Sequence, residues 1–147
     1  MIIESGTTDH MVFSSSFFTS NITKISCRVS FPNITFMLAT HLGNIQLTNK
    51  IVLNDVLCIP SFSFNLIFVK RLTENLSCCL VFINDSCFIE DLYTQTMIGI
   101  AEARSGLYHL LPKAVPPSSL TDFLSCLSPN FPLIAISVKR SIDVNGI

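Results

Sequence analysis

Residues 2–11 of the chain read IIESGTTDHM, and the interpretation of the whole sequence starts from this stretch. Two isoleucines run directly into the carboxylate of Glu4, and small residues follow at 5–7. Isoleucine favours a pleated, half-buried strand, whereas serine, glycine and threonine favour a turn. The pattern therefore predicts a short apolar strand that ends in a loop carrying an acidic side chain.

An acid followed by Ser or Thr and then by Gly is the loop in which aspartic proteases present a catalytic carboxylate. That chemistry needs two carboxylates that share one proton and hold a water molecule between them. The sequence contains one such loop, at Glu4, so a second copy of the chain would have to supply the other carboxylate. Residue types alone leave open the alternative of an ordinary surface turn with an exposed glutamate.

Asp9 and His10 form a second candidate, because an aspartate beside a histidine suggests a catalytic triad. A triad is recognised by its geometry, which adjacency in the sequence does not provide, and the sequence has no G-x-S-x-G motif. We therefore expect Asp9 to accept backbone N–H bonds in the turn. We expect His10 to be a packed or hydrogen-bonded residue rather than a base.

The overall composition predicts a globular domain. Hydrophobic residues make up 49% of the 147 residues and charged residues 13%, which excludes a disordered charged segment. The net charge of −1 gives no signature of nucleic-acid binding. The mean hydropathy is +0.56, yet no window supplies the roughly 20 consecutive apolar residues of a membrane span, and no secretory signal is recognised. A cytoplasmic location without a membrane partner is therefore expected.

The six cysteines are expected to be reduced thiols that behave as small buried apolar residues. No C-x-x-C pair occurs, and the three histidines lie far apart in the sequence. Neither a metal site nor any other cofactor is therefore predicted. The cysteines are Cys27, Cys58, Cys78, Cys79, Cys87 and Cys126.

The chain is predicted to be mostly β. Residues 24–31 (KISCRVSF) alternate apolar and polar side chains, which is the period of a half-buried strand. Residues 64–76 (FNLIFVKRLTENL) repeat apolar side chains at three- and four-residue steps and form the one helical candidate. Further strands are expected within 35–47, 50–60, 78–85, 86–92 and 97–111. Many short strands with one short helix predict a small closed β-barrel.

The character of the sequence changes after residue 111. Residues 112–120 contain three prolines and two serines, which is typical of a linker, and the residues beyond them have no clear periodicity. We therefore predict a β-barrel domain over residues 1–111, followed by a Pro/Ser-rich linker and a loosely ordered, poorly defined tail over residues 112–147.

Several blocks of the sequence, in order, resemble the protease region in the Pol polyproteins of copia-type LTR retrotransposons. The stretch IIESGTTDHM is similar to the family's apolar strand that leads into D-S-G-A-[ST]-x-H-M. Residues 51–73 are similar to its block L-x-[ND]-V-L-x-[IV]-P-x-[LF]-x-x-N-L-[IL]-S-V-x-x-L. The shorter blocks VSFPN, THLGNIQL and SGLYHL occur at the family's positions, and residues 95–111 overlap the start of the family's pre-integrase segment.

This resemblance implies a retropepsin-like (aspartic protease) domain that acts as a homodimer on a peptide substrate, the element's own polyprotein, without a cofactor. The family's catalytic aspartate corresponds to Glu4. The active-site loop of the family corresponds to Ser5, Gly6 and Thr7.

Two departures from the family pattern bear on activity. Glutamate adds one methylene to the catalytic arm, and a misplacement of about 1 Å can cost about a hundredfold in rate. Ile34 stands where the family has the glycine of its L-P-[DN]-G turn, and a β-branched residue resists positive φ. We therefore expect an ancestral aspartic endopeptidase that is now inactive. The alternatives are residual endopeptidase activity, a non-catalytic folded or dimerising module, and a non-functional transposon relic.

Overall fold

The computed structural model describes residues 1–111 and 137–139. Most of the predicted linker and tail therefore lies outside the described residues. Within them, eleven strands form one sheet, accompanied by one α-helix and one turn of 3-10 helix. The elements in chain order are β1 (Ile2–Glu4), β2 (Met11–Val12), η1 (Ser15–Phe17), β3 (Ser20–Phe31), β4 (Ile34–Gln46), β5 (Val52–Cys58), β6 (Leu66–Phe68), α1 (Val69–Leu76), β7 (Cys78–Ile83), β8 (Ser86–Asp91), β9 (Met97–Arg104), β10 (Leu107–Leu110) and β11 (Ser137–Lys139).

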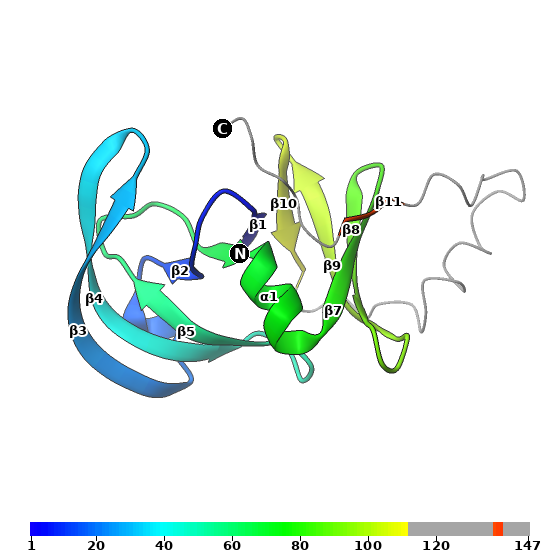
Figure 1. The fold of residues 1–147 in the computed structure, drawn as a ribbon, viewed down its shortest axis with the longest axis horizontal. Coiled ribbons are helices and arrows are strands. Elements are labelled where there is room, and N and C mark those ends of the chain that lie inside the picture. Colours follow the sequence, from blue (N-terminus) through cyan, green and yellow to red (C-terminus); the bar gives the residue numbers. More distant parts are fainter. Residues whose placement is uncertain (112–136, 140–147) are drawn as a thin grey trace, which may run out of the picture.

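The predicted mostly-β fold with one short helix is confirmed, but the described sheet is not closed. Its strand order is β11-β7-β8-β9-β10-β1-β6-β2-β5-β4-β3, and the two end strands do not pair with each other. The long β3–β4 hairpin lies at one side of the molecule and strands β7 to β10 lie at the other (Figure 1). The prediction of a closed barrel is therefore wrong for the part of the chain that the structure describes.

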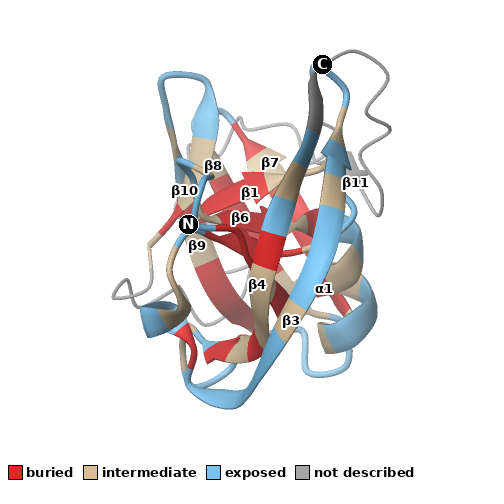
Figure 2. Cartoon of the chain, turned by 90° about the vertical axis from the view of Figure 1, so that its left-hand side faces the viewer, coloured by how far each residue is buried: buried red, intermediate tan, exposed pale blue. Residues whose placement is uncertain are grey.

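The exposure of β3 gives the physical reason for the open edge. Most of its side chains are exposed, so the strand offers little apolar area to bury against a further strand (Figure 2). The predicted inward face is half-buried at Ile25, Val29 and Phe31, whereas Cys27 on the same face is exposed. The alternation thus predicted the strand correctly but overestimated how deeply it is buried.

Three very short strands form the centre of the sheet. Strand β6 pairs in parallel with β1, where Glu4 lies opposite Phe68, and antiparallel with β2, where Met11 lies opposite Leu66. Because β6 separates β1 from β2, the connecting residues 5–10 must pass across the end of β6. This crossing places the Glu4 loop beside the start of α1.

The helix is shorter than the sequence predicts. It begins at Val69, because residues 66–68 are held as β6 by pairing with strands on both sides. It buries Val69 and Leu72 and ends at Leu76, and the C-cap residue Ser77 has a left-handed φ of 47°. With eight residues, α1 is too short to cross a bilayer, and the described residues contain no other helix that meets the length and hydropathy of a membrane span.

The second half of the sheet consists of two hairpins at the positions that turn chemistry predicts. Asn84, between β7 and β8, has a φ of 50°, and Ser105 and Gly106, between β9 and β10, have φ values of 52° and 79°. Two-residue hairpin loops favour such positive φ values because they match the twist of the strands. Strand β10 then pairs antiparallel with β1, where Ile2 lies opposite His109, so the end of the described domain completes the sheet beside Glu4.

The cysteines support the expectation of apolar thiols in four cases. Cys58, Cys78, Cys79 and Cys87 are buried, whereas Cys27 is exposed. Burial raises the pKa of the Cys78 thiol to about 12, so this thiol stays protonated and unreactive at neutral pH. Cys126 lies outside the described residues.

Replacing Gly43 by alanine is expected to destabilise the fold by about 1–3 kcal/mol. A Cβ at this position would lie 2.7 Å from Cγ of Phe18, whose ring is buried against the strand. Urea unfolding followed by circular dichroism measures the effect. Leu38→Ala on the same strand, where the side chain is 45% exposed, is the control and should stay within about 0.5 kcal/mol of the wild type. Equal losses of unfolding free energy in the two variants would contradict the close contact between Gly43 and the Phe18 ring.

Candidate functional site

The loop after β1 brings the predicted site residues together at one end of the short central strands. Oε1 of Glu4 accepts hydrogen bonds from the backbone N–H groups of Ser5 and Gly6, at 2.8 Å each. The hydroxyl of Thr7 donates to the backbone oxygen of Asp9 at 3.3 Å. Glu4 is half-buried, and Gly6 is exposed. The carboxylate is thus folded back onto its own loop.

Glu4 lines a groove of about 380 Å³. The loop forms one part of this groove, and the tip of the β3–β4 hairpin forms another part. Apolar side chains dominate, since the rings of Phe31 and Phe62 stack with centroids 5.5 Å apart. Glu4 is the one charged side chain among the described residues that line the groove, which are Glu4, Gly6, Thr7, Phe31, Pro32, Asn33, Phe62 and Leu66. The site combines one carboxylate with an aromatic wall.

Asp9 contacts the helix instead of capping the turn as predicted. Its Oδ1 lies 2.9 Å from Nη1 of Arg71 in an ion pair, and its Oδ2 accepts a hydrogen bond from the hydroxyl of Thr8. The same Nη1 donates to the backbone oxygen of Asp55 on β5 at 3.2 Å. Arg71 therefore ties the Glu4 loop to both α1 and β5, and sequence reasoning missed it because its partners lie far away along the chain.

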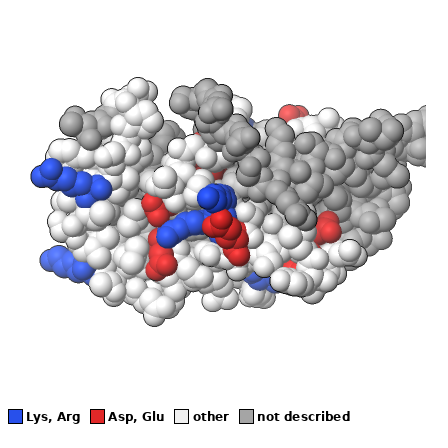
Figure 3. Space-filling view, in the orientation of Figure 1, with Lys and Arg blue, Asp and Glu red and all other residues white. Residues whose placement is uncertain are grey.

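Charges of both signs are interspersed on the face that carries α1. Figure 3 shows basic and acidic side chains next to one another in the middle of this face, with further basic side chains at the side where β3 and β4 lie. No large patch of one sign dominates this view, so the face offers no strong electrostatic field to a charged partner.

His10 is fully buried, as the expectation of a packed residue requires. Its Nδ1 accepts a hydrogen bond from the backbone N–H of Phe68 at 2.9 Å, and its Nε2 has no hydrogen-bond partner among the described residues. Burial, and secondarily the positive charge of Arg71, lowers the pKa of His10 to about 4 against the opposing effect of Asp9. The imidazole is therefore neutral at pH 7 and is shielded from any substrate.

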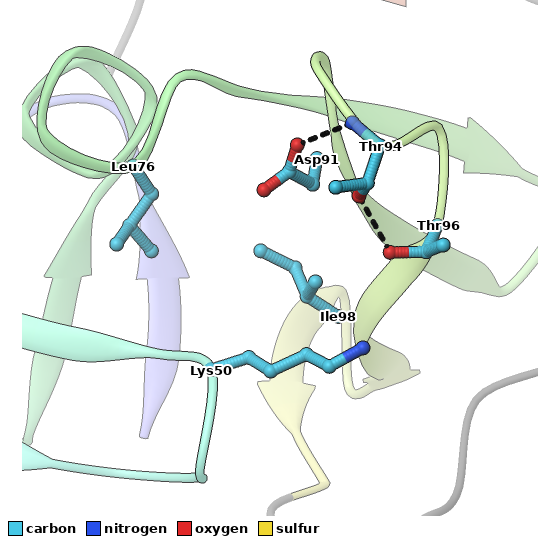
Figure 4. Close-up of a pocket in the computed structure, with 6 residues that line it drawn as sticks. All are labelled: Lys50, Leu76, Asp91, Thr94, Thr96 and Ile98. Carbon is cyan, nitrogen blue, oxygen red and sulfur yellow. Dashed lines mark hydrogen bonds between the residues drawn. The ribbon is translucent and has the colours of Figure 1, made fainter.

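A second hollow, of about 330 Å³, lies between the end of α1 and the β8–β9 turn (Figure 4). Oδ1 of Asp91 accepts from the backbone N–H groups of Thr94 and Tyr93, and these bonds lower the pKa of its carboxyl. The hydroxyls of Thr94 and Thr96 bond to each other. These groups stabilise the turn itself. Among the described residues, no three His, Cys, Asp or Glu side chains gather closely enough to hold a metal ion.

Comparison with known families gives one match. Residues 1–76 match the family model described as Pol polyprotein, beta-barrel domain, which covers just over half of the 147 residues. The matched region runs from β1 to the end of α1 and includes the Glu4 loop, His10 and Arg71. The comparisons with curated proteins and with solved structures gave no match.

Replacing Arg71 by methionine is expected to lower the free energy of unfolding by about 1 kcal/mol, because the ion pair with Asp9 is only partly exposed. The two side chains are 33% and 29% exposed. Lys70→Met is the matched control, since Lys70 pairs with Glu74 through side chains that are 67% and 60% exposed. Urea unfolding measures the free energy of unfolding of both variants. A loss in Lys70→Met as large as that in Arg71→Met would contradict a stabilising role of the Arg71–Asp9 pair.

The stability of the fold is expected to fall as the pH drops from about 6.5 to about 4. The folded state holds the pKa of His10 at about 4, below its ordinary value of 6.5, so the unfolded chain binds a proton first. The contribution of neutral His10 to the free energy of unfolding is complete above pH 6.5. It is lost progressively as the pH falls to about 4, and the total loss is about 3 kcal/mol. Urea unfolding across this range measures it. In His10→Asn, which does not titrate, this part of the pH dependence should disappear; a slope identical to the wild type would rule out His10 as the cause.

Proposed function

Because the chain belongs to the family of Pol polyprotein beta-barrel domains and is thus retrotransposon-derived, we propose that it is a retropepsin-like domain of copia type. Its ancestor was an aspartic endopeptidase that processed its own polyprotein as a homodimer. In the present chain, Glu4 replaces the catalytic aspartate and proteolytic activity is lost. The proposed domain spans residues 1–111, with residues 112–147 as linker and tail.

The observation that carries this proposal is the groove beside Glu4. It combines a single carboxylate with apolar walls from Phe31, Phe62 and Leu66, and it is bordered by the tip of a long hairpin. Its volume of about 380 Å³ lies in the range of sites for small ligands or for a few peptide side chains. Such a groove suits an extended apolar peptide segment.

The homodimer is proposed because the chemistry needs a second carboxylate. Among the described residues, Glu4 is the one acid in the groove, and the nearby Asp9 is already paired with Arg71. A dyad that shares a proton must therefore combine two copies of the Glu4 loop. The exposed Gly6, which has no side chain, allows the backbones of two such loops to come close.

The conformation of Glu4 supports loss of activity. One carboxylate oxygen accepts two backbone hydrogen bonds from its own loop at 2.8 Å each. Two longer arms must also fit where two aspartates shared a proton, and small misplacements of reacting groups are costly. We infer that both effects remove the geometry that activates a water molecule.

A non-catalytic folded or dimerising module is the second candidate. Its support is the retained core: the buried cluster joins both halves of the sheet, from Ile3 and Val12 to Ile89 and Leu110. A core of this kind is what a folded or dimerising module without catalytic activity requires.

Glu4→Asp is expected to restore cleavage of polyprotein-derived peptides, whereas the wild type should cut none. The shorter arm places the carboxylate where the dyad geometry needs it. Cleavage is measured between about pH 4 and pH 7, where a carboxylate dyad shares its proton, with product detection by mass spectrometry. Glu4→Gln is the matched control, because it keeps the length of the arm and cannot ionise.

Cleavage by the wild type that is absent in Glu4→Gln would overturn the proposed loss of activity. If neither the wild type nor Glu4→Asp cuts while both stay folded and dimeric by circular dichroism and light scattering, the non-catalytic module is favoured. A folded monomer in both cases would contradict the proposed homodimer.

A further inference from the structure

His10 is a buried polar group that the proposed chemistry does not use. It lies in the loop that follows Glu4, immediately before β2, and none of its surface is exposed. Its backbone oxygen accepts from the N–H of Leu57 on β5, and its Nδ1 accepts from the N–H of Phe68 on β6. One residue thus joins the loop to two strands. Buried polar groups are usually retained for a reason, because each has a desolvation cost.

The tautomer of His10 follows from its hydrogen bond. A backbone N–H can only donate, so Nδ1 must be unprotonated and the proton of the neutral ring must be on Nε2. That Nε2–H finds no acceptor among the described residues. The ring is therefore held by a single bond, the one from Phe68, and the strength of the attachment depends entirely on Nδ1 remaining an acceptor.

The position of Phe68 connects this bond to the candidate site. Phe68 lies directly opposite Glu4 in the parallel pairing of β1 and β6, and it is the last residue before α1 begins. The Phe68 amide therefore belongs to the residue of β6 that lies beside the end of β1. The loop that carries the Glu4 hydrogen bonds has to cross this point.

We propose that His10 is a positioning residue for the Glu4 loop. Its neutral imidazole attaches the loop to the junction of β6 and α1, and protonation of Nδ1 releases the loop. On protonation the ring takes up one proton from solvent, and Nδ1–H then faces the N–H of Phe68, so that two donors oppose each other and the hydrogen bond is lost. The proposal rests on the proposed function only for the chemical role of Glu4.

The charged surroundings of His10 decide when this release occurs. Arg71 on α1 disfavours a second positive charge nearby, and Asp9 in the same loop favours it, but these two groups are paired with each other at 2.9 Å. On β6, no side chain titrates. On β5, Asp55 offers its backbone oxygen to Arg71, and Cys58 is a buried thiol. Burial therefore has the largest effect on the protonation of His10, and the loop is released only at acidic pH.

The test is nuclear magnetic resonance of the full-length, ¹⁵N-labelled chain in a Glu4→Gln background, which removes the titration of Glu4 itself. Long-range ¹H–¹⁵N correlations of the imidazole report the tautomer of His10. The amide signal of Phe68 reports the hydrogen bond, and the amide signals of Ser5 and Gly6 report the contacts of residue 4. All are followed from neutral to acidic pH.

We expect the Nε2–H tautomer, and we expect the amide signals of Phe68, Ser5 and Gly6 to move with the same midpoint as the His10 ring. His10→Asn keeps an acceptor near the position of Nδ1 and should make these signals independent of pH. His10→Leu should leave the Phe68 amide without its acceptor at every pH, with about tenfold faster hydrogen exchange. His41→Asn on β4 is the matched control and should leave the response unchanged, because His41 bonds to Thr40 in the same strand.

An Nδ1–H tautomer, or a Phe68 amide that ignores the titration, would overturn the proposal. So would a Phe68 signal that titrates while those of Ser5 and Gly6 stay fixed, because His10 would then be structural without positioning the loop. If acid unfolds the chain before the ring titrates, His10→Asn should unfold at a lower pH than its parent, and equal unfolding midpoints would refute the role. None of these readouts depends on peptide cleavage. The positioning role of His10 can therefore be confirmed or refuted whether or not the proposed function is correct.

Discussion

The fold depends on one short strand, β6, holding β1 on one side and β2 on the other. None of these strands has more than three residues, and strands of that length are not stable by themselves. Their backbone groups are satisfied because β5 and β10 continue the sheet on the two outer sides. The crossing of residues 5–10 over the end of β6 follows from this arrangement. It determines where an acidic side chain at the end of β1 must lie, whatever that side chain does.

The loop at this crossing is fixed by polar groups on two levels. Near the surface, Arg71 joins Asp9 to the backbone of Asp55, and beneath it the His10 imidazole receives the Phe68 N–H. The partly exposed ion pair is expected to contribute about 1 kcal/mol, whereas a buried N–H that loses its acceptor costs about 1–3 kcal/mol. The buried bond therefore has the greater influence on the loop, and the ion pair restricts its motion further.

The groove beside Glu4 has the apolar walls that a peptide site needs, yet its carboxylate is engaged by its own loop. Two backbone N–H groups satisfy one oxygen of Glu4. A carboxylate in a proton-sharing dyad must instead face its partner across a water molecule. The extra methylene of glutamate is also the change that separates this chain from the protease pattern it resembles. The proposed loss of proteolysis is therefore compatible with an intact fold around the same loop.

The sequence by itself determined the local features. The acid-bearing loop after an apolar strand, the hairpin turns at Asn84 and Ser105–Gly106, and the family match all depend on neighbouring residues. Only the tertiary structure decided that residues 66–68 form a strand rather than the start of the helix, since that choice comes from pairing with β1 and β2. The partner of Asp9, the acceptor role of His10 and the open edge at β3 were likewise beyond local reasoning. Each of them depends on groups that are distant in sequence and meet only when the chain has folded, so no short-range pattern records them.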